Sequence, residues 1–470
     1  MANVSIDSGS DPRGLAPGVY IRERGPIPGP GMATGVPLFI GFVHSQIGGV
    51  ADEEAPLHRP ADRPGAPTGR AGHHRGRTLS QARRQRPPAG TEEDDGDGPK
   101  AVRLASWDQF AHTVGHPRSD SFLGYAVRGF FENGGKHCVV LPLSVHEETG
   151  TAAEALSHAL RSVFQPEMYR FDDKGLRGVL DDIDDVDLVC VPDIMIKEIW
   201  QSAHGRRTVL ELQQHVLEYC RDMGERFAIL DVWPGDAAHV AGGVEGAREH
   251  WRDLASPDGA LYGPWVLVTS LDGSGKVWVP PCGHVAGIYA RTDAQVGFHK
   301  APANEIVDGV VDVQFEITHE DQGRLNDVGV NCLVSFPRRG IRLWGARTLS
   351  PHRNWRYVNV RRIFLTLVRW IQHNMDDVVF EQNDPAIWNV TRERLTGFCY
   401  ELFQRGALKG ITPEEAFFVK CDAELNRREE REEGKVLCEV GLAPLSPAEF
   451  ILIQITRSAA GTTIEAAGGA

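Results

Sequence analysis

Apolar and polar residues alternate in blocks over residues 36–270, and the blocks predict strands that take turns with amphipathic helices. Runs rich in Val, Ile, Leu and Phe, each suited to a buried strand, lie at 36–43, 137–143, 186–191, 227–232 and 265–269. Apolar residues recur at helical spacing over 121–131, 208–223 and 246–254. Buried strands separated by helices predict an α/β fold with a mainly parallel sheet covered on both faces.

Beyond residue 300 the pattern changes. Strands are predicted at 313–318 and 330–336, followed by a helix from about 357 to 373 whose apolar residues recur three, four and seven positions apart. A further helix starts at Asp384-Pro385, where a capping residue precedes a proline that the first turn tolerates, and ends before Gly406. These elements predict a separate α+β domain.

Two short β-prone runs near the chain ends lack a neighbouring strand to pair with. One, at 19–22, is followed by a Gly/Pro-rich stretch, and the other, at 450–455, is apolar at five of six positions. Because unpaired backbone groups are costly to bury, we expect each run to complete a sheet in another subunit. The predicted exchange residues are Val19, Tyr20, Ile21, Arg22, Phe450, Ile451, Leu452, Ile453, Gln454 and Ile455. The predicted tether residues are Gly25, Pro26, Pro28, Gly29, Pro30, Pro444 and Pro447.

The predicted organisation therefore has four parts and one insertion. An N-terminal arm covers 1–30, the α/β middle domain 31–300, the α+β domain 301–447 and a C-terminal arm 448–470. Within the middle domain, residues 48–99 change in composition, with eight arginines in 59–86 and five acidic residues in 92–97. A basic tract can bind nucleic acid, but the adjoining acidic block would partly neutralise it, so a poorly ordered, solvated loop is favoured.

Composition excludes several classes of protein. Among 470 residues, 41% are apolar and 24% are charged, which excludes wholesale disorder, and the net charge of −14 argues against a general nucleic-acid binder. No run approaches the roughly 20 apolar residues that span a bilayer, and the first residues lack the layout of a secretory signal. Eight cysteines, none in a C-x-x-C pair, are expected to be buried free thiols in a reducing compartment rather than disulfides or a zinc site.

No motif marks an assembled active site. Gly273-Ser274-Gly275-Lys276 lacks the earlier glycine and the following Ser or Thr of a phosphate loop, and His112 and His116 lack the glutamate of a zinc protease. The acidic run 181–187 could bind a hard cation, but the glycine turn and distal glutamate of calcium loops are absent, so a solvated loop is favoured. We therefore predict no catalytic, cofactor or metal residues, although a hydrolase triad assembled in space stays open.

Several segments, taken together, resemble the tail sheath proteins of contractile phages and of related contractile injection systems. Their number and order, over most of the chain outside 48–99, make the resemblance specific. They are Pro17–Tyr20, Phe39–Gly41, Tyr125–Gly135, Pro280–Asp293, Lys300–Asn304, Leu343–Leu349, Tyr357–Arg362, Gly410–Val419 and Pro447–Phe450.

The resemblance implies a non-enzymatic sheath subunit that stacks in rings around an inner tube and contracts from an extended to a contracted helical lattice. It implies strand exchange between the two arms and neighbouring inner domains. It also implies baseplate and cap partners, with no direct nucleic-acid binding, no membrane insertion and a location in the bacterial cytoplasm. The family's subtilisin-like middle domain confers no protease activity.

Overall fold

The computed structural model describes most of the two predicted domains and parts of the arms. The described residues are 5–6, 20–21, 34–43, 100–114, 118, 120–144, 151–164, 176–234, 244–375, 381–432, 436–447, 452–458 and 461–467. Outside them lie the predicted insertion 48–99, the tether stretch Gly25–Pro30, and the exchange residues Val19, Arg22, Phe450 and Ile451.

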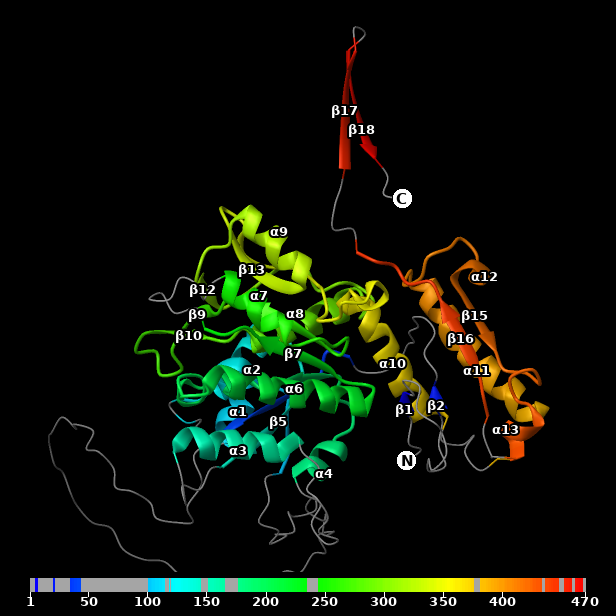
Figure 1. Cartoon of the computed structure of the whole chain (residues 1–470), viewed down its shortest axis with the longest axis horizontal. Coiled ribbons are helices and arrows are strands. Elements are labelled where there is room, and N and C mark those ends of the chain that lie inside the picture. The colour runs from blue at the N-terminus through cyan, green and yellow to red at the C-terminus, as the bar shows by residue number, and fades with distance from the viewer. Residues whose placement is uncertain are drawn as a thin grey trace, which may run out of the picture. The chain divides into compact units, whose positions relative to one another are not determined.

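A nine-stranded sheet forms the centre of the α/β part (Figure 1). Its six central strands are parallel, because β5, β3, β6, β7, β8 and β13 pair in that order with parallel register. The predicted parallel sheet is confirmed. In order across the sheet, the strands are β11 (Glu305–Ile306), β14 (Gly340–Trp344), β13 (Val330–Phe336), β8 (Gly259–Gly263), β7 (Phe227–Asp231), β6 (Leu188–Cys190), β3 (Pro37–Phe42), β5 (Cys138–Leu143) and β4 (Val102–Leu104).

Helices cover both faces of this sheet, and each face has its own core. Along β3, Leu38 and Ile40 point into one core and Phe39 into the other, as the two-residue period of a strand requires. One core is built with α3 (Ala152–Phe164), α6 (Gly205–Met223), α7 (Val244–Arg252) and α9 (His319–Val328). The other is built with α1 (Trp107–Thr113), α2 (Leu123–Glu132) and α8 (Cys282–Gln295).

Helices α2 and α8 pack with almost no space between their backbones. A Cβ on Gly283 would lie 2.1 Å from the carbonyl oxygen of Ala126, and one on Gly287 would lie 2.5 Å from that of Phe130. Only glycine fits at such contacts, so the two helices cannot accept a side chain at either position without moving apart.

The predicted domain boundary at residue 300 does not divide the sheet. β11, β13 and β14 all follow residue 300, yet they extend the sheet whose other strands precede it. The strand predicted at 265–269 is β9 (Val266–Thr269), which pairs outside this sheet with β10 (Lys276–Val279) and β12 (Val310–Val313). The boundary was wrong because β8 was not predicted, and β8 supplies the edge that β13 joins.

A smaller α+β part follows β14. The helices α10 (Val358–Asn374) and α11 (Pro385–Gln404) share a third core with a two-stranded antiparallel sheet of β15 (Phe417–Lys420) and β16 (Glu439–Leu442). Figure 1 shows this small sheet running beside α11. As predicted, α11 begins after Asp384, whose carboxylate accepts hydrogen bonds from the backbone N–H groups of Ala386 and Ile387. The short helices α12 (Pro413–Ala416) and α13 (Arg428–Glu432) flank β15.

The remaining elements are short connections. They are α4 (Leu176–Asp181), α5 (Lys197–Trp200) and the 3₁₀ turns η1 (Pro192–Met195) and η2 (Arg353–Trp355). Ser106 caps α1 as predicted, since its side chain accepts a hydrogen bond from the Gln109 N–H. Within the part of the chain that the structure describes, no helix is long and apolar enough to cross a membrane.

The two terminal strands have partners within the chain, which corrects the prediction that they are orphans. β2 (Tyr20–Ile21) pairs in parallel with β1 (Ser5–Ile6). β17 (Leu452–Ser458) pairs antiparallel with β18 (Gly461–Ala467), so the C-terminal run forms a hairpin. The second strand was missed because Gly461-Thr462-Thr463 and the following alanines have low hydrophobicity. Among described residues, each of these two-stranded sheets has no further strand.

Six cysteines are buried free thiols, as expected, but two are bonded to each other. Cys421 and Cys438 form a disulfide, so the prediction of eight free thiols was wrong. The two residues directly extend the Lys420↔Glu439 pairing of β15 and β16, which brings their Cα atoms to 4.4 Å. The sequence separation of 17 gave no indication of this pairing.

Candidate interface for strand exchange

The β15–β16 sheet has one face on a core and one face exposed. Phe417, Val419, Val440 and Leu442 pack against the third core, whereas Phe418 points away from it and is 54% exposed. Phe418 lies across Gly441 on the partner strand, where a Cβ would meet its ring. The glycine therefore makes room for an aromatic side chain on the open face.

Both outer edges of this sheet carry backbone groups that face away from the hairpin. The N–H of Ala443 donates to the carbonyl of Ala416, which sets the alternation of bonded and non-bonded pairs along the two strands. In this register, Val419 and Val440 form a non-bonded pair, so their N–H and C=O groups point outward. No third strand occupies either edge among the described residues. Among the described residues, the outward backbone groups of Val419 and Val440 therefore face no third strand, and residues 407–409 bond to the chain only beyond the end of β16.

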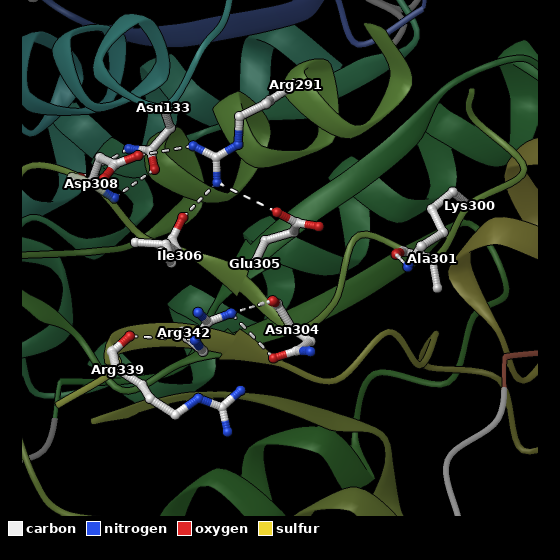
Figure 2. Close-up of polar contacts among 10 residues, drawn as sticks. All are labelled: Asn133, Arg291, Lys300, Ala301, Asn304, Glu305, Ile306, Asp308, Arg339 and Arg342. Atoms are coloured by element: carbon white, nitrogen blue, oxygen red, sulfur yellow. Dashed lines mark hydrogen bonds and ion pairs between the residues drawn. The ribbon is translucent and has the colours of Figure 1, made fainter. Parts of the chain in front are cut away.

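The β11 edge of the nine-stranded sheet is closed by side chains (Figure 2). The Val307 N–H donates to the Ile341 carbonyl, so the preceding Ile306 turns its own carbonyl away from β14. Arg291 from α8 donates to that carbonyl at 2.6 Å and to the Asp308 carboxylate at 2.9 Å. Its guanidinium thus occupies the place that an added strand would need.

Side chains also fix the loop that carries β11. Asn133 bonds the backbone of Asp308 from both sides, because its amide donates to the carbonyl at 3.0 Å and its oxygen accepts from the N–H at 2.9 Å. Arg342 donates to the Asn304 carbonyl at 2.7 Å, where Asn304 has a left-handed backbone (Figure 2). Hydrogen bonds therefore hold the edge strand β11 in place at both ends.

Two adjacent arginines of α10 join the α+β part to the α/β part. Arg362 donates to Asp293 at 2.8 Å and to Asp187 at 2.9 Å, and all three side chains are buried. Arg361 forms a second buried ion pair with Asp258 at 2.8 Å. Burial opposes the charge on Arg362, but the carboxylates of Asp293 and Asp187 outweigh it, so the pKa of the guanidinium is raised.

Other buried ionisable groups serve as backbone partners. Asp193 accepts hydrogen bonds from the N–H groups of Phe42 and Phe122, both at 2.6 Å, and burial raises its pKa to about 6. Burial also raises the pKa of Asp231, which accepts from the Cys282 N–H, to about 7. Each carboxylate fixes the start of a helix next to the sheet. No group of three potential metal ligands was found among described residues.

The predicted exchange residues that the structure describes lie in the terminal sheets. Tyr20 and Ile21 form β2, and Leu452 to Ile455 lie in β17. Of the predicted tethers, Pro444 forms a β-bridge with Leu408, and the next residue, Leu445, bonds to Ala407. The chain is thus held up to Leu445, and Pro447 is the predicted tether residue that lies beyond this held segment.

Sequence reasoning missed the β15–β16 sheet and the buried arginines. β15 and β16 were not predicted, because Phe417–Lys420 and Glu439–Leu442 are only four residues each. Arg361-Arg362 interrupts the apolar face of a helix, and a charge at such a position points to a buried partner. The acidic run was interpreted as a solvated loop, but its last member, Asp187, is buried and paired.

Two family models match adjacent parts of the chain. The model of the phage tail sheath protein central domain matches residues 199–349, and that of the phage tail sheath C-terminal domain matches residues 350–457. The chain belongs to the contractile tail sheath family. The two matches meet between β14 and α10, which is where the nine-stranded sheet ends and the α+β part begins.

Curated sheath proteins are similar over parts of their length. A putative prophage major tail sheath protein of Pseudomonas aeruginosa (strain UCBPP-PA14) is 26% identical over 283 residues, 53% of this chain and 68% of that protein. The tail sheath protein of Salmonella phage ViI is 22% identical over 201 residues. That match covers 41% of this chain and 31% of the phage protein.

Solved sheaths of injection systems resemble nearly the whole chain. The helical sheath of the anti-feeding prophage in its contracted state has a TM-score of 0.61 at 26% identity, covering 94% of this chain and 99% of that one. The contracted PVC sheath of an extracellular contractile injection system has a TM-score of 0.61 at 25% identity, covering 95% and 98%. These sheath matches give no support to the hydrolase alternative.

Proposed function

We propose that this sheath subunit polymerises by strand exchange, with the β15–β16 sheet of each copy accepting strands from the arms of neighbouring copies. The observation that carries the proposal is the pair of open edges at Val419 and Val440, beside a large sheet whose β11 edge Arg291 closes. A strand added at an open edge gains several backbone hydrogen bonds, each contributing about 1 kcal/mol net.

The two arms supply the donated strands in this proposal. The run Val19–Arg22 adds at one edge, and the run Phe450–Ile455 adds at the other. β17 has one edge bonded to β18 and the opposite edge without a strand among the described residues, so the C-terminal hairpin can be donated as a unit. The hairpin thus replaces the single strand that the sequence predicted.

Contraction requires subunits that stay connected while their packing changes. The buried pairs of Arg361 and Arg362 support movement of the two folded parts as one rigid body. The chain after Leu445, together with the Gly/Pro-rich stretch at 25–30, provides tethers that can hinge. We infer that the extended lattice is metastable and that each subunit gains a few kcal/mol on contraction, about the scale that shifts such equilibria.

The partners follow from this function. Similarity to subunits of the anti-feeding prophage baseplate structure supports self-assembly and contact with a baseplate. We propose that an inner tube protein fills the sheath and that a cap ends it, that assembly takes place in the bacterial cytoplasm, and that the chain catalyses no reaction. Nucleic acid and membrane have no direct part in the proposal.

Electron microscopy of the purified protein and of two truncations tests the proposal. Full-length protein is expected to form sheath-like tubes, whereas variants that lack residues 1–24 or 448–470 stay folded by circular dichroism and form none. Both truncations leave β15, β16 and the nine-stranded sheet complete. Long tubes from either truncation would contradict strand exchange.

A further inference from the structure

The disulfide lies at the end of the proposed acceptor sheet. Cys421 follows β15 directly, and Cys438 precedes β16 directly, so the bond closes the hairpin at the end opposite Phe417 and Leu442. Both side chains lie on the core side, because they continue the alternation of Val419 and Val440. A Cα separation of 4.4 Å is within the range that disulfides span.

Neighbouring side chains hold the two cysteines in register. Asn426, which is buried, donates to the Leu437 carbonyl at 2.9 Å and accepts from the Leu437 N–H at 2.6 Å. It bonds Leu437 on both sides, as a neighbouring strand would. Cys438 is therefore placed opposite Cys421 by hydrogen bonds that do not need the disulfide.

The other cysteines are poor competitors for oxidation. All six are buried, and burial raises the pKa of the Cys332 and Cys399 thiols to about 12. Since the thiolate is the species that reacts, these residues stay inert. Cys438, by contrast, is only half-buried, so a small oxidant has more access to it than to the six free cysteines.

We propose that Cys421 and Cys438 form a redox staple that locks the acceptor sheet once an assembled sheath leaves the reducing cytoplasm. This rests on the proposed strand exchange. The Cys438 thiolate attacks a small-molecule disulfide such as oxidised glutathione and releases one thiol. The Cys421 thiolate then attacks the mixed disulfide and releases the second thiol, which leaves one protein disulfide, two reduced small thiols and no net change in protons.

The staple has a mechanical consequence. A strand bonded to the outer edge of β15 or β16 pulls on a sheet of two four-residue strands. With the disulfide closed, β15 and β16 cannot peel apart or slip in register from that end. A sheath that contracts outside the cell therefore carries its load through a cross-linked acceptor.

Peptide mapping tests whether the bond forms. Trypsin cleaves after Lys420, Arg427 and Lys435, so Cys421 and Cys438 fall on different peptides that hold no other cysteine. After exposure of assembled protein to oxidised glutathione, we expect the linked pair of peptides in mass spectra. Two free or separately glutathionylated peptides would overturn the proposal.

Guanidinium denaturation of oxidised and reduced protein tests whether the bond matters. Closing a loop of this size is expected to shift the unfolding equilibrium of the α+β part roughly a hundredfold. The matched control changes both cysteines to valine, Cys421→Val with Cys438→Val, a pair suited to a non-bonded cross-strand position. A second control uses serine at both positions.

The outcomes separate the two proposals. Wild-type protein that resists guanidinium better when oxidised, together with control variants indifferent to dithiothreitol, supports the staple. Equal resistance of oxidised and reduced wild-type protein overturns it. Tube formation is measured on reduced protein, so reduced protein that forms no tubes contradicts strand exchange. The guanidinium experiment tests the Cys421–Cys438 staple independently of that result.

Discussion

Arg362 of α10 and Asp293 of α8 form a buried ion pair in which the guanidinium Nη1 lies 2.8 Å from the carboxylate Oδ1. The arginine comes from the part matched by the C-terminal domain model, and the aspartate from the part matched by the central domain model. Asp187 joins the same guanidinium and also accepts from the N–H groups of Gly35 and Val36. One side chain therefore connects both folded parts and the segment that leads into β3.

Changing Arg362 to methionine is expected to destabilise the chain strongly. The substitution leaves the carboxylates of Asp187 and Asp293 buried without their cation, which typically costs about 3 to 5 kcal/mol. Urea denaturation followed by tryptophan fluorescence measures the loss. The control Arg405→Met removes an exposed pair with Glu401 and should cost less than about 1 kcal/mol. Equal losses in both variants would contradict a special role for Arg362.

A proline at Val419 is expected to stop assembly without unfolding the subunit. The Val419 N–H faces away from β16, so proline removes a group that only an added strand would use. Val419→Ala removes more of the side chain than proline does but keeps the N–H, which makes it the control for lost packing. We expect tubes in electron micrographs from the alanine variant and none from the proline variant. Normal tubes from Val419→Pro would argue against this acceptor edge.

Acid is expected to weaken the fold through His250. Its Nδ1 accepts from the Trp233 N–H and its Nε2 lies 2.5 Å from the Gln213 oxygen, while burial, aided by Arg206, lowers its pKa to about 3. The unfolded chain protonates this histidine near pH 6.5, whereas the folded protein keeps it neutral. The free energy of unfolding is therefore highest above pH 6.5 and falls as the pH drops below that value. The loss should be about 3 kcal/mol between pH 6.5 and pH 4.

Comparison with His250→Gln isolates this contribution. Asp193 and Asp231, whose pKa values are raised to about 6 and about 7, act in the opposite direction, because their stabilisation is lost as the pH rises through those values. These aspartates are common to both proteins, so the difference between wild type and His250→Gln in denaturant midpoint should shrink as the pH falls to 4. A constant difference would show that His250 does not titrate as described.

Replacing residues 48–99 with a short Gly/Ser linker is expected to leave assembly intact. β3 and β4 lie on either side of β5, and the end of β3 pairs near Leu143 while the start of β4 pairs with Val140. Two strand spacings across the sheet and three residues along it separate the two ends by about 14 Å, which a linker of about six residues can span. Tube formation in electron micrographs checks the prediction, and a folded variant that forms no tubes would give the insertion a structural role.

The sequence predicted elements better than it predicted their partners. The apolar run of β3 and the Asp384-Pro385 start of α11 depend on neighbouring residues, and both were found. The pairing of β13 with β8 joins residues about 70 positions apart, and nothing local specifies it. For that reason the boundary was placed at residue 300 rather than after β14.

In the candidate interface too, locally determined elements were predicted and long-range contacts were not. Leu452–Ile455 was recognised as a strand from its own composition. Its pairing with β18, the pairing of β15 with β16 and the Cys421–Cys438 bond each depend on contacts with residues elsewhere in the chain. Arg361-Arg362 could have been singled out, because charges on an apolar helical face need buried counterions. Their partners Asp187, Asp258 and Asp293 could not have been identified from spacing.

The guanidinium of Arg291 over the Ile306 carbonyl has a consequence for newly made copies. Before a sheath nucleates, many copies whose arm strands are not yet donated are present together. An open edge on the nine-stranded sheet would let these strands add there and form off-pathway polymers. Because Arg291 bonds the Ile306 carbonyl, strand addition at the β11 edge is blocked. In the proposed strand exchange, arm strands are then directed to the β15–β16 sheet rather than to the β11 edge.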